Sequence, residues 1–181
     1  MTPEVFRIET PLPAPAATVY AWHEDPEALE LLSPDSAGIE ILKPAEIKVG
    51  EVAHLRVPLF PGLMKIDWLA EIDFVQPGLE FRDLQVKGPF RRWYHRHQFI
   101  PQSSGCLMRD EVEFLLPGGI ILHHLGKAFV HAQLSKMFSY RHQKLTEIFG
   151  ISDRKLSNNR LSIEFPEVHP ENPILRYADE F

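Results

Sequence analysis

The sequence contains a single cysteine, Cys106, among its 181 residues. A lone cysteine cannot form an internal disulfide, which excludes a disulfide-stabilised scaffold and fits a reducing compartment. We therefore expect Cys106 to be a small buried core residue. Long hydrophobic runs are also missing, since the longest, near Ile120–Leu122, is far too short to cross a bilayer. Met1–Glu4 lacks the basic and apolar regions of a signal peptide, so we expect a cytoplasmic protein without a transmembrane segment.

An excess of positive charge is absent as well. The net charge is −6, whereas a protein that binds nucleic acid needs a basic face to displace counterions. The sequence also lacks a Gly-x-Gly-x-x-Gly loop, a Walker loop, a Gly-x-Ser-x-Gly elbow and the thiol pairs of a zinc ribbon. We therefore expect no nucleic-acid partner, no cofactor and no bound metal.

The pattern of apolar and turn residues predicts one strand, two short helices, six strands and one long helix. The expected strands cover residues 4–12, 37–43, 51–60, 65–75, 79–87, 91–101 and 106–116, and the expected helices cover 16–24, 27–32 and 121–149. Asp25 is the expected N-cap of the second helix and Pro26 its first residue. The connections between strands are too short for parallel crossovers, so the strands should be antiparallel.

This order predicts the α+β class, with a curved seven-stranded antiparallel sheet that buries one face against the long C-terminal helix. Residues 1–150 form the expected domain. Residues 151–181 form a polar extension that we expect to pack on the domain or to contact a partner.

Alternation assigns the faces of the strands. Residues 91–101 place Trp93, His95, His97 and Phe99 on the inner face, and residues 106–116 place Cys106, Met108, Asp110, Val112 and Phe114 there. The same argument turns Trp68, Ile72, Phe74, Phe81, Asp83 and Gln85 inward. The hairpin loops then set Asp83 opposite His95 and His97 opposite Asp110, giving two His–Asp pairs on an otherwise apolar face.

Three interpretations of the His–Asp pairs are open. Two buried carboxylates need donors, and two imidazoles supply them, so the pairs can be a satisfied polar network. Alternatively they form a ligand-orienting or acid/base site, in which the aspartates fix the histidine tautomers. A metal site is the weakest interpretation, because two neighbouring aspartates would rather orient histidines than bind the ion themselves.

Over residues 4–149 the chain resembles the SRPBCC superfamily of START-like and pollen-allergen-like helix-grip proteins, in particular its bacterial cyclase/dehydrase-like members. The resemblance is strongest in the stretch from Gly88 to Phe99, which contains Gly-Pro-Phe and Trp-x-His-x-His-x-Phe. The other segments that carry it are Trp68–Ile72, Phe81–Gln85, Asp110–Val112, Leu116–Pro117 and Phe138–Arg141.

The resemblance implies a cavity between sheet and C-terminal helix for an apolar, lipid- or polyketide-like molecule. The residues expected to bind it are Trp68, Ile72, Phe74, Phe81, Gln85, Trp93, His95, His97, Phe99, Met108, Phe114, Leu134 and Phe138. The apolar turn at Pro58–Met64 is either a packed hairpin tip or a rim over the cavity mouth.

Two other functions stay open, because this superfamily hosts carriers, sensors and enzymes. The first is a cyclase, dehydratase or isomerase, with His95 and His97 as acid/base groups and Asp83 and Asp110 as their orienting partners. The second is an interaction module or homodimer that uses Leu84 and Val86, or residues 161–165.

Overall fold

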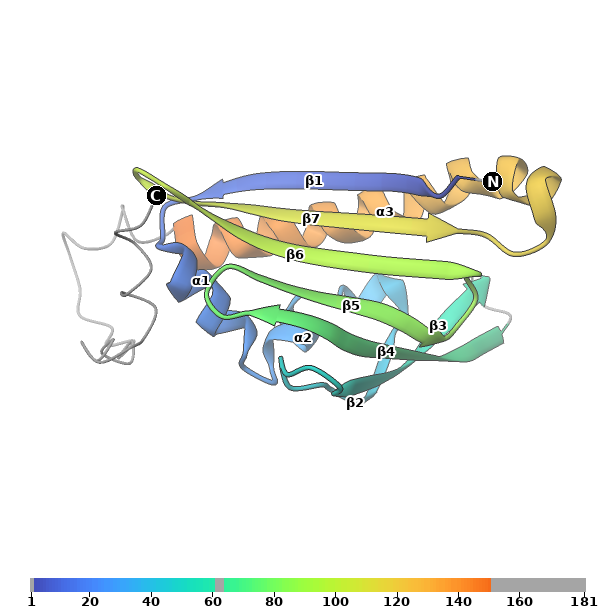
Figure 1. Ribbon diagram of the computed structural model, residues 1–181, viewed down its shortest axis with the longest axis horizontal. Helices are drawn as coiled ribbons and strands as arrows, with labels where there is room; N and C mark the ends of the chain where they lie inside the picture. Colours follow the sequence, from blue (N-terminus) through green and yellow to red (C-terminus); the bar gives the residue numbers. More distant parts are fainter. Residues whose placement is uncertain (1, 61–63, 151–181) are drawn as a thin grey trace.

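The computed structural model describes residues 2–60 and 64–150, and these form a helix-grip fold (Figure 1). The strands are β1 (Glu4–Leu12), β2 (Glu40–Lys43), β3 (Val52–Phe60), β4 (Met64–Gln76), β5 (Glu80–Lys87), β6 (Arg92–Gln102) and β7 (Gly105–Leu115). They pair antiparallel in one sheet with the order β1-β7-β6-β5-β4-β3-β2. The helices are α1 (Ala16–His23), α2 (Ala28–Leu31), a 3₁₀ turn η1 (Asp35–Ala37) and α3 (Gly119–Gly150). The α+β fold predicted from the sequence is therefore confirmed.

Helix α3 runs along the β1–β7 side of the sheet, whereas β2, β3 and β4 curve away from it (Figure 1). It buries one stripe of side chains that includes Leu134, Phe138 and Leu145. Gly118 and Gly119 have φ values of 87° and 79°, a conformation that favours glycine, and they turn the chain from β7 into the helix. The inner face of β4 and β5 instead packs on the α1–α2 segment, since Tyr20 and Leu32 share a buried cluster with Ile72 and Phe81.

Two predicted boundaries are wrong for local reasons. The strand expected over 37–43 begins only at Glu40, because residues 35–37 form the 3₁₀ turn. Asp25 is not the N-cap of α2, whose N-cap is Glu27. The side chain of Asp25 instead accepts a hydrogen bond of 2.9 Å from the backbone amide of Glu27 and so stabilises the turn before the helix.

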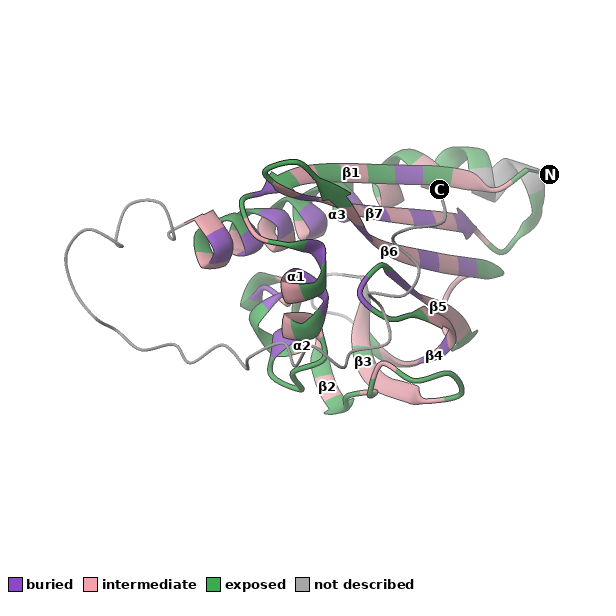
Figure 2. Cartoon of the chain, turned by 60° about the vertical axis from the view of Figure 1, so that its left-hand side comes forward, coloured by how far each residue is buried: buried purple, intermediate pink, exposed green. Residues whose placement is uncertain are grey.

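The buried hydrophobic residues form two clusters, and purple and non-purple residues alternate along the central strands in Figure 2. The first cluster lies under α1 and the C-terminal end of α3 and includes Phe81, Phe99 and Met108. The second lies under the first half of α3 and includes Trp93, Phe114 and Phe138. Cys106 belongs to the first cluster and is 1% exposed, as expected.

Phe74 corrects the predicted faces. A bulge between Ile72 and Phe74 shifts the pairing of β4 with β5, so that Phe74 lies opposite Arg82. The Arg82 guanidinium lies 4.1 Å from the centre of the Phe74 ring, on the outer face of the sheet. Val75 takes the inward position and packs on the first cluster. Strict alternation failed here because a bulge inserts one residue and reverses the faces beyond it.

Some predictions fall outside the described residues. These are the extension at 151–181 and the centre of the hairpin tip at 61–63. Within the described part of the chain, no helix is long and apolar enough to cross a membrane.

Candidate functional site

The four polar residues predicted on the inner face meet at the centre of the sheet. Asp83 comes from β5, His95 and His97 from β6, and Asp110 from β7. Asp83 pairs with His95 and His97 pairs with Asp110, so the predicted register is confirmed. The alternation of the three neighbouring strands therefore places two carboxylates and two imidazoles on one apolar face.

Each carboxylate contacts both imidazoles, which is more than the sequence predicted. Asp110 Oδ1 lies 3.0 Å from His95 Nε2 and 2.9 Å from His97 Nδ1. Asp83 Oδ2 lies 3.3 Å from His95 Nδ1 and 3.3 Å from His97 Nε2. The four side chains thus close a ring in which aspartates and histidines alternate, with short contacts at Asp110 and longer ones at Asp83. We call these four residues the His–Asp ring.

Helix α3 adds a third histidine that the sequence analysis missed. His142 Nε2 lies 2.9 Å from Asp110 Oδ2, and its Nδ1 lies 2.7 Å from Thr10 Oγ1 on β1. A signal for this residue existed, because His142 follows the buried Phe138 by four positions and precedes Leu145 by three. Asp110 consequently contacts three imidazoles and links the sheet to the helix.

Burial differs across the His–Asp ring. The side chains of Asp110 and His95 are 4% and 5% exposed, whereas those of His97 and Asp83 are 12% and 16% exposed. The Asp83–His97 edge is therefore the more accessible side of the ring.

The charges of the ring support one another. Burial by itself would raise the pKa of both carboxyls, but the surrounding imidazoles hold the pKa of Asp83 below its usual range and that of Asp110 well below it. Burial would lower the pKa of His95, but hydrogen bonds to Asp110 and Asp83 outweigh it and raise that pKa to about 9. At neutral pH the structure thus holds carboxylates and a protonated His95 in its interior.

His23, the last residue of helix α1, was also not predicted, and its pKa is shifted in the opposite direction to that of His95. Its Nδ1 donates to the carbonyl oxygen of Val19 at 2.8 Å, and its ring lies edge-on to Phe99 at 5.0 Å. Burial lowers the pKa of His23 to about 4, so the ring is neutral at pH 7. Its Nε2 is then a bare acceptor, and within residues 2–60 and 64–150 this buried atom has no hydrogen-bond partner.

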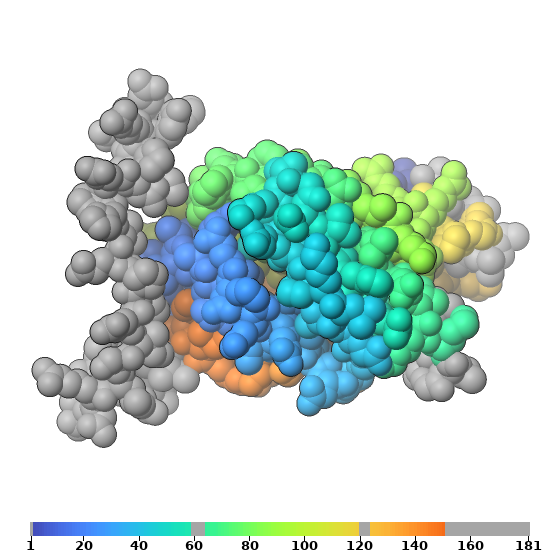
Figure 3. Space-filling view, turned by 90° about the horizontal axis from the view of Figure 1, so that it is seen from below, coloured from blue at the N-terminus to red at the C-terminus, as the bar shows by residue number. Residues whose placement is uncertain are grey.

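A buried cation lies in the same region. Arg141 Nε donates to the carbonyl oxygen of Leu32 at 3.1 Å, and the guanidinium lies 5.1 Å from the centre of the Phe138 ring. Burial lowers the pKa of Arg141, although Asp110 and Asp83 act in the opposite direction. The α1–α2 segment lies beside α3 on this face of the molecule (Figure 3).

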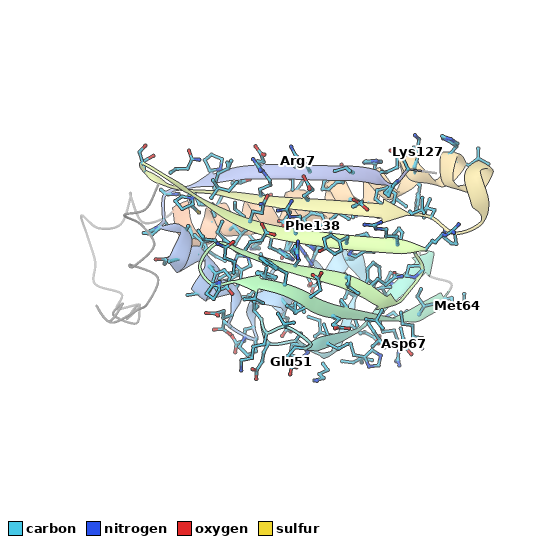
Figure 4. The ribbon with its side chains drawn as sticks, viewed as in Figure 1. Arg7, Glu51, Met64, Asp67, Lys127 and Phe138 are labelled. Atoms are coloured by element: carbon cyan, nitrogen blue, oxygen red, sulfur yellow. The ribbon has the colours of Figure 1, made fainter. Side chains whose placement is uncertain are left out.

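Partly buried hydrophobic side chains surround the second cluster. Trp68 and Phe90 on the sheet side and Val130 and Met137 on α3 pack at the edge of the second cluster. Leu55 pairs directly with Trp68, so it lies on the same inner face, where it is also only partly buried. In Figure 4, Phe138 lies at the centre of the molecule and Asp67 at the outer rim of β4. The inner face of β3 and β4 is thus apolar and incompletely covered.

The structure sorts the predicted ligand-binding residues into four groups. The buried members are Ile72, Phe81, Trp93, His95, Phe99, Met108, Phe114, Leu134 and Phe138. Trp68 and His97 are partly accessible. Gln85 binds the chain itself, since its amide nitrogen donates to the Phe90 carbonyl at 2.7 Å and its amide oxygen accepts from the Phe90 amide at 3.2 Å. Phe74, on the outer face, cannot line an interior site.

A hollow of about 560 Å³ lies elsewhere, at the end of the sheet. Its walls are the loops before α1, between β4 and β5, and between β6 and β7, including Pro15, Leu79 and Ser104. It is therefore not the cavity that the sequence predicted between sheet and helix.

Replacing His23 with glutamine is expected to flatten the acid dependence of stability. The unfolded chain takes up a proton at position 23 near pH 6.5 but the folded protein only near pH 4, so folded stability falls as the pH drops between these values. The wild type should lose about 3 kcal/mol across this window through His23 alone. Urea unfolding at pH 7.5, 6.0, 5.0 and about 4.0 measures the difference between the two proteins. Parallel pH curves for the wild type and the variant would contradict the buried neutral imidazole.

Comparison with solved structures places the fold among known proteins. The Zhui aromatase/cyclase from a Streptomyces species is 12% identical with a TM-score of 0.65, covering 87% of this chain and 99% of that one. A point mutant of norcoclaurine synthase from Thalictrum flavum, in complex with a transition-state analogue, is 13% identical with a TM-score of 0.63, covering 83% and 96%. A nucleoside-diphosphate sugar epimerase from Corynebacterium glutamicum is 24% identical with a TM-score of 0.63, covering 82% of this chain and 30% of that one. At these identities the similarities establish the fold alone.

Sequence comparison adds a family. Residues 12–138 match the family described as polyketide cyclase / dehydrase and lipid transport. No curated protein matches the chain.

Proposed function

Because the chain belongs to the polyketide cyclase / dehydrase and lipid transport family, we propose that it binds an apolar, polyketide- or lipid-like small molecule. The molecule lies between α3 and the inner face of β3 and β4. One polar group of this ligand meets the Asp83–His97 edge of the His–Asp ring.

The observation that carries the proposal is the position of the His–Asp ring between two apolar clusters. A ring that only filled the core would have no need of solvent exposure. The side chains of Asp83 and His97 nevertheless remain 16% and 12% exposed. Binding sites for small molecules are mostly apolar and contain a few placed polar groups that orient the ligand. The inner face of this sheet has that composition.

The unpartnered Nε2 of His23 is the second support. A buried acceptor without a donor is costly, and such a group in a native protein calls for an explanation. A hydroxyl or enol group of a ligand would supply the missing hydrogen bond. The rings of His23 and His97 both lie against Phe81, with ring-centre distances of 6.3 and 4.1 Å, so the two polar positions are on the same side of the core.

Filling the apolar space with a larger side chain is expected to block binding. Leu55→Trp places an indole on the inner face beside Trp68, where it would occupy the proposed site. Fluorescence titration with anilinonaphthalene sulfonate, an apolar aromatic probe, should show saturable binding to the wild type. Leu55→Trp should bind the probe about tenfold more weakly or worse, since this loss requires only about 1.4 kcal/mol.

Leu84→Trp is the matched control, because Leu84 pairs with Tyr94 on the opposite face of the sheet. This variant should bind the probe like the wild type. Equal binding by all three proteins, with a normal unfolding transition in each, would place the probe outside the proposed site and argue against the proposal.

Catalysis is a second candidate function, favoured by the opposed pKa values of His95 and His23. At pH 7 an imidazole with a pKa of about 9 is protonated and one with a pKa of about 4 is neutral, which are the protonation states of a general acid and a general base. The reaction class would be proton abstraction next to a carbonyl, as in a cyclase, dehydratase or isomerase. The wild type should then accelerate hydrogen–deuterium exchange of the ketone α-tetralone, and His23→Gln should lose about 10²-fold or more of that rate. If the folded wild type exchanged the α-hydrogens of α-tetralone no faster than the unfolded protein does, the result would contradict this catalytic function.

A further inference from the structure

We propose that Asp83, His95 and His97 bind one divalent first-row metal ion, with zinc as the fitting ion, and that Asp110 orients the two histidines. The ion would occupy the Asp83–His97 edge, the same side of the His–Asp ring that the proposed organic ligand meets. No metal was expected from the sequence, because strand alternation gives both aspartates the same orienting role. The structure gives them different roles.

The two sides of the His–Asp ring differ in the length of their contacts. Asp110 Oδ1 lies at 2.9 and 3.0 Å from the histidine nitrogens that face it, near the length of a charge-assisted hydrogen bond. Asp83 Oδ2 lies at 3.3 Å from both nitrogens on the other side, which is long for such a bond. A carboxylate that receives the N–H groups of two metal-binding histidines is the usual support of a metal site, and Asp110 has that position.

The three remaining atoms have the spacing of ligands on one ion. Asp83, His95 and His97 each offer one ligand atom, and these three atoms lie within 4.8 Å of one another. Zinc bonds nitrogen and oxygen at about 2.0–2.2 Å, so two ligands at a tetrahedral angle are about 3.4 Å apart. The observed 3.3 Å from Asp83 to each histidine nitrogen fits this separation.

The accessible edge of the ring suits an ion that exchanges with solvent. The Asp83 and His97 side chains are the exposed members, so an ion enters there and keeps at least one coordination position for water or a ligand. Imidazole nitrogen with a carboxylate is a donor set suited to zinc.

Isothermal titration calorimetry with zinc chloride alone tests the proposal on protein that has been treated with a chelator and dialysed. The wild type should bind one zinc ion per chain at pH 7.5. Asp83→Asn and His97→Gln should abolish this binding, and Asp110→Asn should weaken it by about 10–100-fold, as expected for a residue that orients ligands. His54→Gln is the matched control, since His54 lies 3.4 Å from Asp67 in a more exposed pair of the same sheet, and it should bind zinc like the wild type.

A second measurement does not depend on the variants. Cobalt chloride added to the wild type should produce the visible absorption of four-coordinate cobalt, and zinc should remove it. No heat with zinc and no cobalt band would overturn the proposal, and so would zinc binding that Asp83→Asn and His97→Gln leave unchanged. Leu55→Trp separates the two claims, because it should block the aromatic probe while zinc binding persists.

Discussion

Replacing Asp110 with alanine is expected to lower the free energy of unfolding by about 3–5 kcal/mol in chelator-treated protein. The carboxylate accepts from His95, His97 and His142, and all three imidazoles lose a partner when it is removed. Two of them sit on the sheet and one on α3, so the loss also removes the polar link between these layers. Urea unfolding at pH 7 measures the change.

Two further variants define what is lost. Asp110→Asn keeps the volume and one acceptor oxygen, so it should destabilise clearly less than alanine does. Asp67→Ala removes a carboxylate that also faces one histidine and two cationic side chains, but on the outer face, where its side chain is 35% exposed. That variant should cost far less than Asp110→Ala does, because exposed ion pairs contribute little. An equal loss for Asp110→Ala and Asp67→Ala would show that the ring does not stabilise the fold.

Replacing Phe138 with alanine should cost about 3–5 kcal/mol, the usual range for a buried phenylalanine. Its side chain is fully buried and lies 5.5 Å from Phe6 and 5.1 Å from His95, between ring centres. Alanine would leave a cavity at the point where α3 meets the His–Asp ring. Thermal and urea unfolding of the variant measure the loss.

Phe129→Ala is the control on the same helix. Phe129 is 50% exposed, so its removal should cost less than about 1 kcal/mol. Phe138→Leu, which keeps most of the apolar volume, should fall between the two. If Phe129→Ala destabilised the protein as much as Phe138→Ala, the result would contradict the packing of α3 described above, in which Phe138 faces the sheet and Phe129 faces solvent.

The sequence was sufficient for the centre of the site because β6 and β7 alternate without interruption. Trp93, His95 and Phe99 all face inward, and the short loop before Cys106 fixes the register that brings His97 opposite Asp110. Period-two alternation and loop length are local properties of the chain, which is why they could be read directly.

Where the register changes, local reasoning failed. The bulge beside Phe74 depends on how β4 pairs with β5, and the alternating sequence of β4 does not predict it. Gln85 does have an inward position, but the adjacent Gly88–Pro89 turn uses its amide at Phe90. Such a hydrogen bond depends on the three-dimensional path of the loop.

Residues from the helices were missed because they reach the site only through tertiary packing. His142 lies on the buried stripe of α3, but its contact with Asp110 depends on how the helix rotates and docks on the sheet. His23 ends a short helix whose angle to the sheet the sequence does not specify. Helical periodicity identifies the buried stripe, whereas the partner of each residue on it is a property of the whole fold.

A crystal structure of the protein isolated from its natural host tests the central claim most directly. We expect electron density for an apolar molecule between α3 and the inner face of β3 and β4. A polar atom of that molecule should lie within hydrogen-bond distance of Asp83 or His97, or of the unpartnered Nε2 of His23. Side chains packed continuously across this space, with no bound molecule in it, would contradict the account.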